Sequence, residues 1–174
     1  MANTMTLIAS STVGAGGASS IDFSSIPSTY TDLCVKMSLR AANSAAYNSS
    51  QLTFNNSATG YTYLALWGNS SGAVSVSNTY NYIEWMYSDA ANATANTFSN
   101  TEIYVPNYLS SSQKSVNFDI VTENNSSSVN TAFQVLMAGL WSGTAAINRV
   151  TITAGSSSTF VQYSTAYLYG VKSS

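Results

Sequence analysis

The side chains that could transfer protons, hold metals or attack a carbonyl are few in this chain of 174 residues. There is no histidine, a single cysteine (Cys34), and seven carboxylates stand against five bases. Acid–base catalysis near neutral pH, zinc binding and Ser-His or Cys-His nucleophiles ordinarily need histidine or several cysteines. The composition therefore predicts a protein that is not an enzyme, has no catalytic or metal-binding residues, and uses no cofactor.

Paired carboxylates are the one catalytic device that needs no histidine, because two of them can hydrolyse a glycosidic bond. The seven candidates are dispersed along the sequence: Asp22, Asp32, Glu84, Asp89, Glu102, Asp119 and Glu123. Glu84 is the best of them, since it lies between Ile83 and Trp85, where burial favours a protonated carboxyl. A solvent-facing strand residue is the simpler interpretation of Glu84.

Two short motifs resemble catalytic or phosphate-binding loops. The run Gly68–Gly72 has the letters of a G-x-S-x-G nucleophile elbow, but Ala73–Val76 reads as a strand and no histidine could accept the serine proton. Gly14–Gly17 resembles the start of a dinucleotide loop, yet Ile21–Pro27 follows where a helix would be needed. We interpret the first as a hairpin turn and the second as a flexible glycine turn.

Small neutral polar residues fill the space that charges usually take. Only 7% of residues are charged, whereas the chain contains 32 Ser, 19 Thr, 17 Asn and 12 Tyr. The hydrophobic share of 45% and the aromatic share of 12% provide material for a core, so disorder is excluded. This length and composition predict a single all-β domain over residues 1–174.

Short runs rich in β-branched and aromatic residues alternate with Asn, Ser and Gly clusters. The clearest strand is Thr31–Arg40, where Leu33, Val35, Met37 and Leu39 share one face. In the same way Val116, Phe118 and Ile120 alternate with Lys114, Asn117 and Asp119. Further expected strands are Met5–Val13, Gln51–Asn55, Tyr61–Trp67, Ala73–Ser77, Tyr80–Tyr87, Glu102–Val105, Ala132–Trp141, Arg149–Thr153 and Phe160–Val171.

About eleven short strands predict an antiparallel β-sandwich of jelly-roll-like form. Only Ser88–Thr97, with four alanines, is a candidate for a helical turn. Tyr61–Trp67 and Ala132–Trp141 are apolar on both faces, which is typical of central strands or of strands in a subunit interface. Sheets usually protect their edges with charges, so a chain this poor in charge is expected to cover them by self-association or docking.

Aromatic clusters raise the question of carbohydrate binding, because sugars stack on aromatic rings. The clusters are Tyr61-Tyr63-Trp67, Tyr80-Tyr82-Trp85 and Tyr163-Tyr167-Tyr169. Tyrosine and tryptophan are also common in strands and at protein interfaces. We prefer packing or subunit contact for these clusters, and no glycan-binding residue is assigned.

The remaining partner classes are judged from charge and hydropathy. The five bases are scattered (Lys36, Arg40, Lys114, Arg149 and Lys172), so nucleic acid is not an expected partner. No stretch is long and apolar enough for a membrane span, and Met1–Met5 lacks the basic start of a signal peptide. We expect synthesis in the cytoplasm, and a buried structural role for Cys34.

Both ends of the chain resemble small structural proteins of tailed bacteriophages. The resemblance lies in the segment Thr6–Leu33, which includes Val13-Gly14-Ala15-Gly16-Gly17 and Ile21-Asp22-Phe23, and in the ending Ser164–Val171. It implies a virion protein with a jelly-roll-like sandwich, usually a homotrimer, that decorates or cements the capsid or belongs to a head or tail appendage. The family has no catalytic motif to carry over.

A non-enzymatic capsid decoration protein is thus the leading expectation, assembled in the host cytoplasm and bound to the major capsid protein or another virion protein. Its segment Ala2–Val13 is a candidate N-terminal arm or first strand. The alternative is a receptor-binding module of a head or tail fibre that recognises host glycans, with Trp67 and Trp85 as the residues to test. An enzyme that acts on cell-wall glycan through Glu84 is the third and weakest hypothesis.

Overall fold

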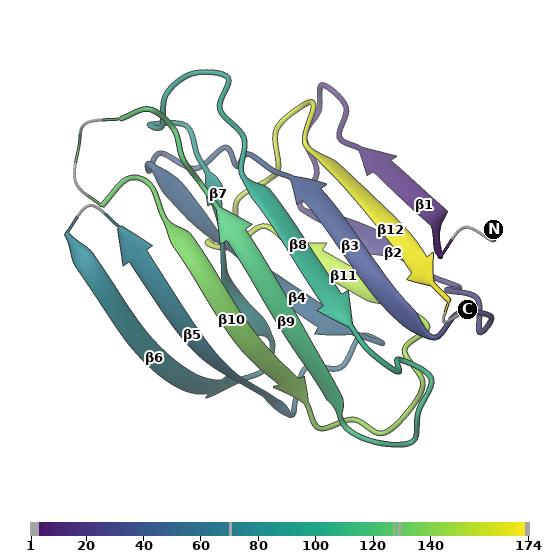
Figure 1. Ribbon diagram of the computed structural model, residues 1–174. Helices are drawn as coiled ribbons and strands as arrows, with labels where there is room; N and C mark the ends of the chain where they lie inside the picture. The colour runs from purple at the N-terminus through teal and green to yellow at the C-terminus, as the bar shows by residue number, and fades with distance from the viewer. Residues whose placement is uncertain (1–3, 70, 127, 129, 173–174) are drawn as a thin grey trace.

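The protein is a sandwich of two antiparallel β-sheets, as the sequence predicts (Figure 1). The computed structural model describes residues 4–69, 71–126, 128 and 130–172. Its twelve strands are β1 Met5–Thr12, β2 Ser20–Phe23, β3 Asp32–Ser38, β4 Tyr47–Phe54, β5 Tyr61–Asn69, β6 Gly72–Tyr80, β7 Ile83–Asp89, β8 Asn100–Val105, β9 Lys114–Val121, β10 Gln134–Trp141, β11 Val150–Thr153 and β12 Thr165–Val171.

The two sheets differ in width. The larger has the order β1-β12-β3-β8-β9-β10-β5-β6, and the smaller has the order β2-β11-β4-β7. In the smaller sheet the late strand β11 lies between the early strands β2 and β4, so segments far apart in the sequence are neighbours. The meander β8-β9-β10 widens the larger sheet, so the smaller one covers only part of it (Figure 1).

The core lies between the sheets and is built by alternating strands. On β4, Asn48, Ser50, Leu52 and Phe54 point inward, and the residues between them are half-buried or exposed. A strand with one buried face is held in register because a one-residue shift would expose its apolar side chains. The fully buried side chains that fill the core include Leu33, Leu52, Phe54, Tyr61, Ile83, Ile103, Ile120, Val135, Ile152, Phe160 and Leu168.

Lys114 corrects one detail of the predicted pattern. We placed it on the polar face of its strand, but it shares the inner face with Val116 and is only 1% exposed. Its ammonium group donates hydrogen bonds to the carbonyl oxygens of Ser110, at 2.7 Å, and Ser112, at 2.5 Å. Burial lowers the pKa of Lys114. The preceding loop therefore solvates the charge, which a hydropathy pattern does not reveal.

The predicted helical turn at Ser88–Thr97 is wrong. Ser88 and Asp89 end β7, and a series of turns follows them. The described residues contain no helix, and thus no helix that could cross a membrane. Arg40 holds these turns in place, because its guanidinium donates to the carbonyl oxygens of Ala93, Thr94 and Thr97. An isolated helix this short is marginal in water even when it is rich in alanine, and here Ala90 and Ala93 are buried as parts of the turns.

Candidate functional site

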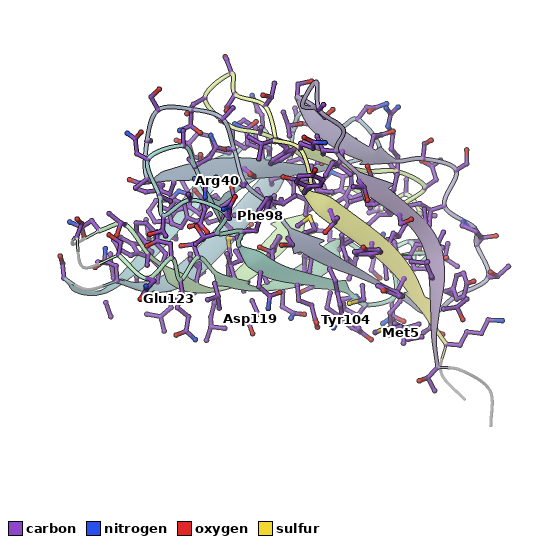
Figure 2. The ribbon with its side chains drawn as sticks, turned by 90° about the horizontal axis from the view of Figure 1, so that it is seen from above. Met5, Arg40, Phe98, Tyr104, Asp119 and Glu123 are labelled. Carbon is purple, nitrogen blue, oxygen red and sulfur yellow. The ribbon has the colours of Figure 1, made fainter. Side chains whose placement is uncertain are left out.

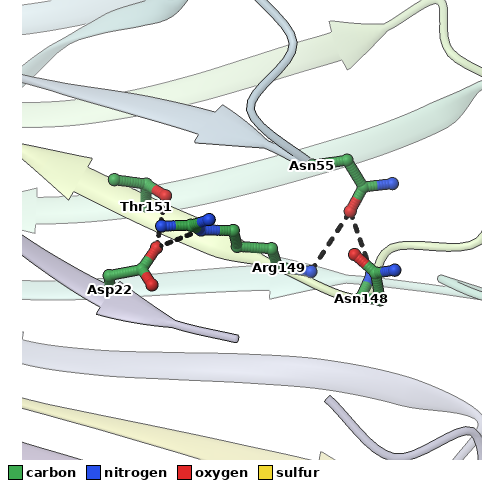
Figure 3. A network of polar contacts seen from close by, with 5 residues as sticks. All are labelled: Asp22, Asn55, Asn148, Arg149 and Thr151. Atoms are coloured by element: carbon green, nitrogen blue, oxygen red, sulfur yellow. Dashed lines mark hydrogen bonds and ion pairs between the residues drawn. The ribbon is translucent and has the colours of Figure 1, made fainter. Parts of the chain in front are cut away.

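Asp22 shows how the carboxylates of this protein are used. Its Oδ1 accepts hydrogen bonds from Arg149 Nε at 2.6 Å and from Thr151 Oγ1 at 2.7 Å (Figure 3). Although burial opposes the shift, these bonds and the charge of Arg149 hold the pKa of Asp22 below its usual value. Beside it, Asn55 Oδ1 accepts from the backbone N–H groups of Asn148 and Arg149. The cluster ties β2 to β11 and is structural.

Two of the predicted candidates do come together. Glu102 on β8 and Asp119 on β9 are cross-strand neighbours on the outer face of the larger sheet, and together with Lys36 they line a small hollow. The Lys36 ammonium lies 2.6 Å from Glu102, and this hydrogen bond raises the pKa of Lys36. Both Lys36 and Glu102 are nearly half exposed, so the pair lies on open sheet surface and not in a cleft that could enclose a substrate.

Glu84 lies half-buried on β7, which is an edge strand of the smaller sheet. Its Oε1 accepts hydrogen bonds from Tyr63 Oη at 2.8 Å and from Trp85 Nε1 at 3.1 Å. Burial and the bond to Glu84 raise the pKa of Tyr63. Trp85 has a φ of 72°, a left-handed backbone that is uncommon for a bulky residue. The Glu84 carboxylate therefore accepts hydrogen bonds from two neutral donors and is paired with no second acid among the described residues.

The predicted aromatic clusters divide into packed and exposed groups. Tyr61 is fully buried, and its hydroxyl bonds to the backbone of Phe54. Trp67 is half-buried between Trp85 and Phe133, with ring centroids 5.9 and 5.7 Å away. Tyr80 and Tyr82 instead form a stacked pair near the surface, 5.6 Å apart with an interplanar angle of 10°. Packing accounts for the first group, and the second remains available to a ligand.

A patch of leucines on the outer face of the larger sheet is a feature that the sequence analysis did not assign. Leu64, Leu66 and Leu136 are 55%, 54% and 52% exposed. Leu66 is paired with Leu136, and Leu64 with Ala138, so the three form one continuous surface over β5 and β10. Shallow hollows run beside it along β6 and β9. We call these three side chains the leucine patch.

The surroundings of the leucine patch are mostly neutral. Ser75 and Ser77 on β6 flank it on one side, and Asn117 and Asp119 on β9 flank it on the other. Figure 2 shows Asp119 and Tyr104 on the outer side of the same sheet. Monomeric proteins rarely keep a continuous apolar patch without a use for it. The apolar residues on both faces of Tyr61–Trp67 and Ala132–Trp141 were the signal in the sequence.

Cys34 and the two loop motifs have structural roles. Cys34 is fully buried between its cross-strand neighbours Tyr104 and Tyr169, and burial raises its pKa to about 11, so it is a poor nucleophile. The run Gly68–Gly72 is the hairpin between β5 and β6, as predicted, although Ser70 lies outside the described residues. Gly14–Gly17 is a turn closed by a bond from Gly17 N–H to Gly14 O.

The described part of the chain holds no cluster of three or more His, Cys, Asp or Glu side chains that could ligate a metal. No known protein-family model matches the sequence, and no curated protein is significantly similar to it. The protein is thus described by its geometry: it is a β-sandwich with an exposed apolar patch and, apart from it, a stacked pair of tyrosines at the surface.

Proposed function

We propose that this chain is a non-enzymatic structural protein of a tailed-phage virion, in which it decorates or cements the head by docking on a neighbouring protein. The observation that carries the proposal is the leucine patch, which offers exposed apolar area on the outer face of the larger sheet. The likeness of the two chain ends to phage structural proteins supports the same conclusion. The major capsid protein is the expected partner, and the homotrimer that this likeness implies stays a prediction.

The energetics favour a packed interface over an ionic one. Full burial of a leucine side chain is worth about 1.5–3 kcal/mol, so covering three half-exposed leucines would contribute about 2–4 kcal/mol. The described surface has only two ion pairs, Lys36 with Glu102 and Arg149 with Asp22, and both are internal to the chain. Contacts between neutral groups vary little with ionic strength, which suits a particle exposed to changing salt.

The proposal is tested by adding the purified protein to phage particles that lack it and measuring the bound copies. The wild type should bind at a fixed number of copies per particle, and the Leu66→Ser/Leu136→Ser double variant should lose most of this binding. Leu109→Ser is the matched control, since Leu109 is 37% exposed but lies in the loop before β9, outside the patch. Equal binding of all three proteins, or no binding by the wild type, would refute the proposal.

A glycan-binding module of a head or tail fibre is the second candidate, and the stacked Tyr80–Tyr82 pair is the observation that favours it. Tyr80 is 41% exposed and Tyr82 is half-buried, so the pair lies at the surface. Burial, and to a lesser extent the charge of the nearby Glu84, raises the pKa of Tyr82. An aromatic platform beside an acceptor is a common arrangement for a neutral sugar. Trp67 is half-buried and packs against Trp85 and Phe133, so it is a less suitable platform than the Tyr80–Tyr82 pair.

A further inference from the structure

Of the four sheet edges in the described part of the chain, the free edge of β6 is the least protected. The two sheets have four edge strands, β1, β2, β6 and β7. Natural proteins protect such edges with charges, bulges or short strands. Here β1 is interrupted by a bulge between Leu7 and Ala9, β2 has only four residues and carries Asp22, and β7 carries Glu84 and Asp89. By contrast β6 is nine residues long, regular in register and uncharged.

The register shows which backbone groups of β6 face outward. Ser142 N–H donates to Gly60 O, so Tyr61 is opposite Trp141 in a non-hydrogen-bonded pair and its own backbone groups turn toward β6. Hydrogen-bonded and non-hydrogen-bonded pairs then alternate along β5 and β6. It follows that Ala73, Ser75, Ser77 and Thr79 direct their N–H and C=O groups to the free edge.

One of these residues is already capped. Asn78 Oδ1 accepts a hydrogen bond from the N–H of Thr79 at 2.9 Å, which ends the open run. Among the described residues, Ala73, Ser75 and Ser77 have no backbone partner beyond this edge. Three donors and three acceptors therefore remain in a row, at the spacing of a strand.

We propose that β6 pairs with β6 of a second copy of this chain, antiparallel and centred on Ser75. A two-fold axis at Ser75 places Ser75 opposite its counterpart and Ala73 opposite Ser77, so the open donors and acceptors of both copies satisfy one another. The pairing matches in charge, because β6 has no ionisable side chain apart from Tyr80 and no like charges meet. The partner is thus a copy of the same strand.

The inner face of β6 supports the same register. Val74 is 44% exposed and Val76 is half-buried at the border of the core. In the Ser75-centred register, Val74 faces Val76 of the other copy in a non-hydrogen-bonded pair, where side chains are closest. The contact would bury an exposed valine on each copy without moving any strand of the monomer.

The β6 pairing itself is argued from the geometry of the sheet edge. Only its role in a virion rests on the proposed function. The joined sheet keeps both outer faces on one side, so the two leucine patches lie on the same surface. Three strand spacings separate β5 from its counterpart, which is about 14 Å. A two-fold contact of this kind joins two monomers or two larger assemblies, and an inter-chain cross-link detects it in either case.

The test compares two variants of the full chain, each of which carries one added cysteine on β6. Ser75→Cys should form an inter-chain disulfide under mild oxidation and migrate as a dimer of twice 18.4 kDa in a non-reducing gel. Ser77→Cys is the matched control, because it lies on the same face two residues away but is opposite Ala73 of the other copy. The wild type controls for Cys34, which is fully buried.

At least tenfold more cross-linking of Ser75→Cys than of Ser77→Cys is the expected result. Equal cross-linking of the two variants, or none in either, would overturn the Ser75-centred pairing. Ser75→Lys supplies a second measurement, since it puts two ammonium groups opposite each other and should shift sedimentation toward the unpaired species. Because neither result involves phage particles, this inference can fail while binding to particles succeeds, or the reverse.

Discussion

Leu66 on β5 and Leu136 on β10 lie directly opposite each other on the outer face of the larger sheet, and each is more than half exposed. Their chain neighbours Ala65 and Val135, whose cross-strand partners are Met137 and Trp67, are fully buried on the inner face. The two strands are therefore apolar on both sides, but only one side has a partner within the monomer. This asymmetry is the physical basis for assigning the outer face to an interaction.

The first prediction separates binding from folding. The Leu66→Ser/Leu136→Ser variant should change the free energy of unfolding by no more than about 0.5 kcal/mol per site, because these side chains gain little from the fold. Leu52→Ala, at a fully buried position, should cost about 2–5 kcal/mol. Urea denaturation followed by tryptophan fluorescence measures both. A large loss in the double serine variant would mean that the patch belongs to the core.

The second prediction concerns Gly139 on β10, where the two sheets approach closely. A Cβ atom there would lie 2.7 Å from Ile83 Cδ1 and 3.1 Å from a Phe118 ring carbon. Gly139→Ala should therefore lower the free energy of unfolding by about 1–3 kcal/mol through overpacking. Ile83→Val removes the atom that Cβ would meet, so the double variant should recover part of the loss. Additive losses in the thermal unfolding of the double variant would contradict this contact.

The third prediction is a pH dependence that arises from Asp89. This carboxyl is fully buried, and burial raises its pKa above 3.8. The charge of Glu123 also raises the pKa, whereas hydrogen bonds from Thr97 and Asn124 and the nearby charge of Arg40 lower it. A raised acid pKa means that the folded state binds the proton more tightly than the unfolded state. The contribution of Asp89 to stability is thus present at low pH and is lost as pH rises through the folded pKa.

Asp89→Asn removes this titration while it keeps an oxygen for Asn124. The stability of the variant relative to the wild type should therefore increase as the pH is raised from about 4 to 7. Denaturant midpoints across that range measure the difference. If the stability of the variant relative to the wild type stayed constant or fell as the pH rose, the pKa of Asp89 would not be raised by burial.

The fourth prediction decides between the two candidate functions. If Tyr80 and Tyr82 form a sugar platform, binding to a glycan array should disappear in Tyr80→Ala and persist in Tyr167→Ala, which removes a similarly exposed tyrosine from β12. The structural proposal predicts no glycan binding by any of the three proteins. Binding that is lost only in Tyr80→Ala would replace it with the receptor-binding alternative.

Particular residues show how much the sequence can reveal. The alternation of Leu33, Val35 and Met37 predicts β3 because each side chain reaches the same core, and the two-sheet architecture follows from repeated patterns of this kind. β2 escaped prediction because Ser20–Phe23 is too short for a period to show. Lys114 was misplaced because two loop carbonyls compensate its burial, and those contacts depend on the tertiary fold.

The candidate sites are less predictable than the fold. Glu84 was chosen for its apolar neighbours, but the position of Tyr63 Oη at 2.8 Å depends on how β5 packs against β7. The leucine patch becomes continuous only when β5 and β10 pair in register, although the alternation of its members is visible in the sequence. The open edge of β6 requires the strand order, since the same nine residues would be unremarkable in the middle of a sheet.

The central claim is that the protein works by docking through neutral, packed surfaces, and salt tests it most directly. Phage particles carrying the protein are sedimented in 0.1 M and in about 1 M sodium chloride, where screening removes most surface ion pairs. We predict that the same number of copies stays on the particles in both solutions. Release of the protein at high salt would contradict the claim and point to an ionic interface.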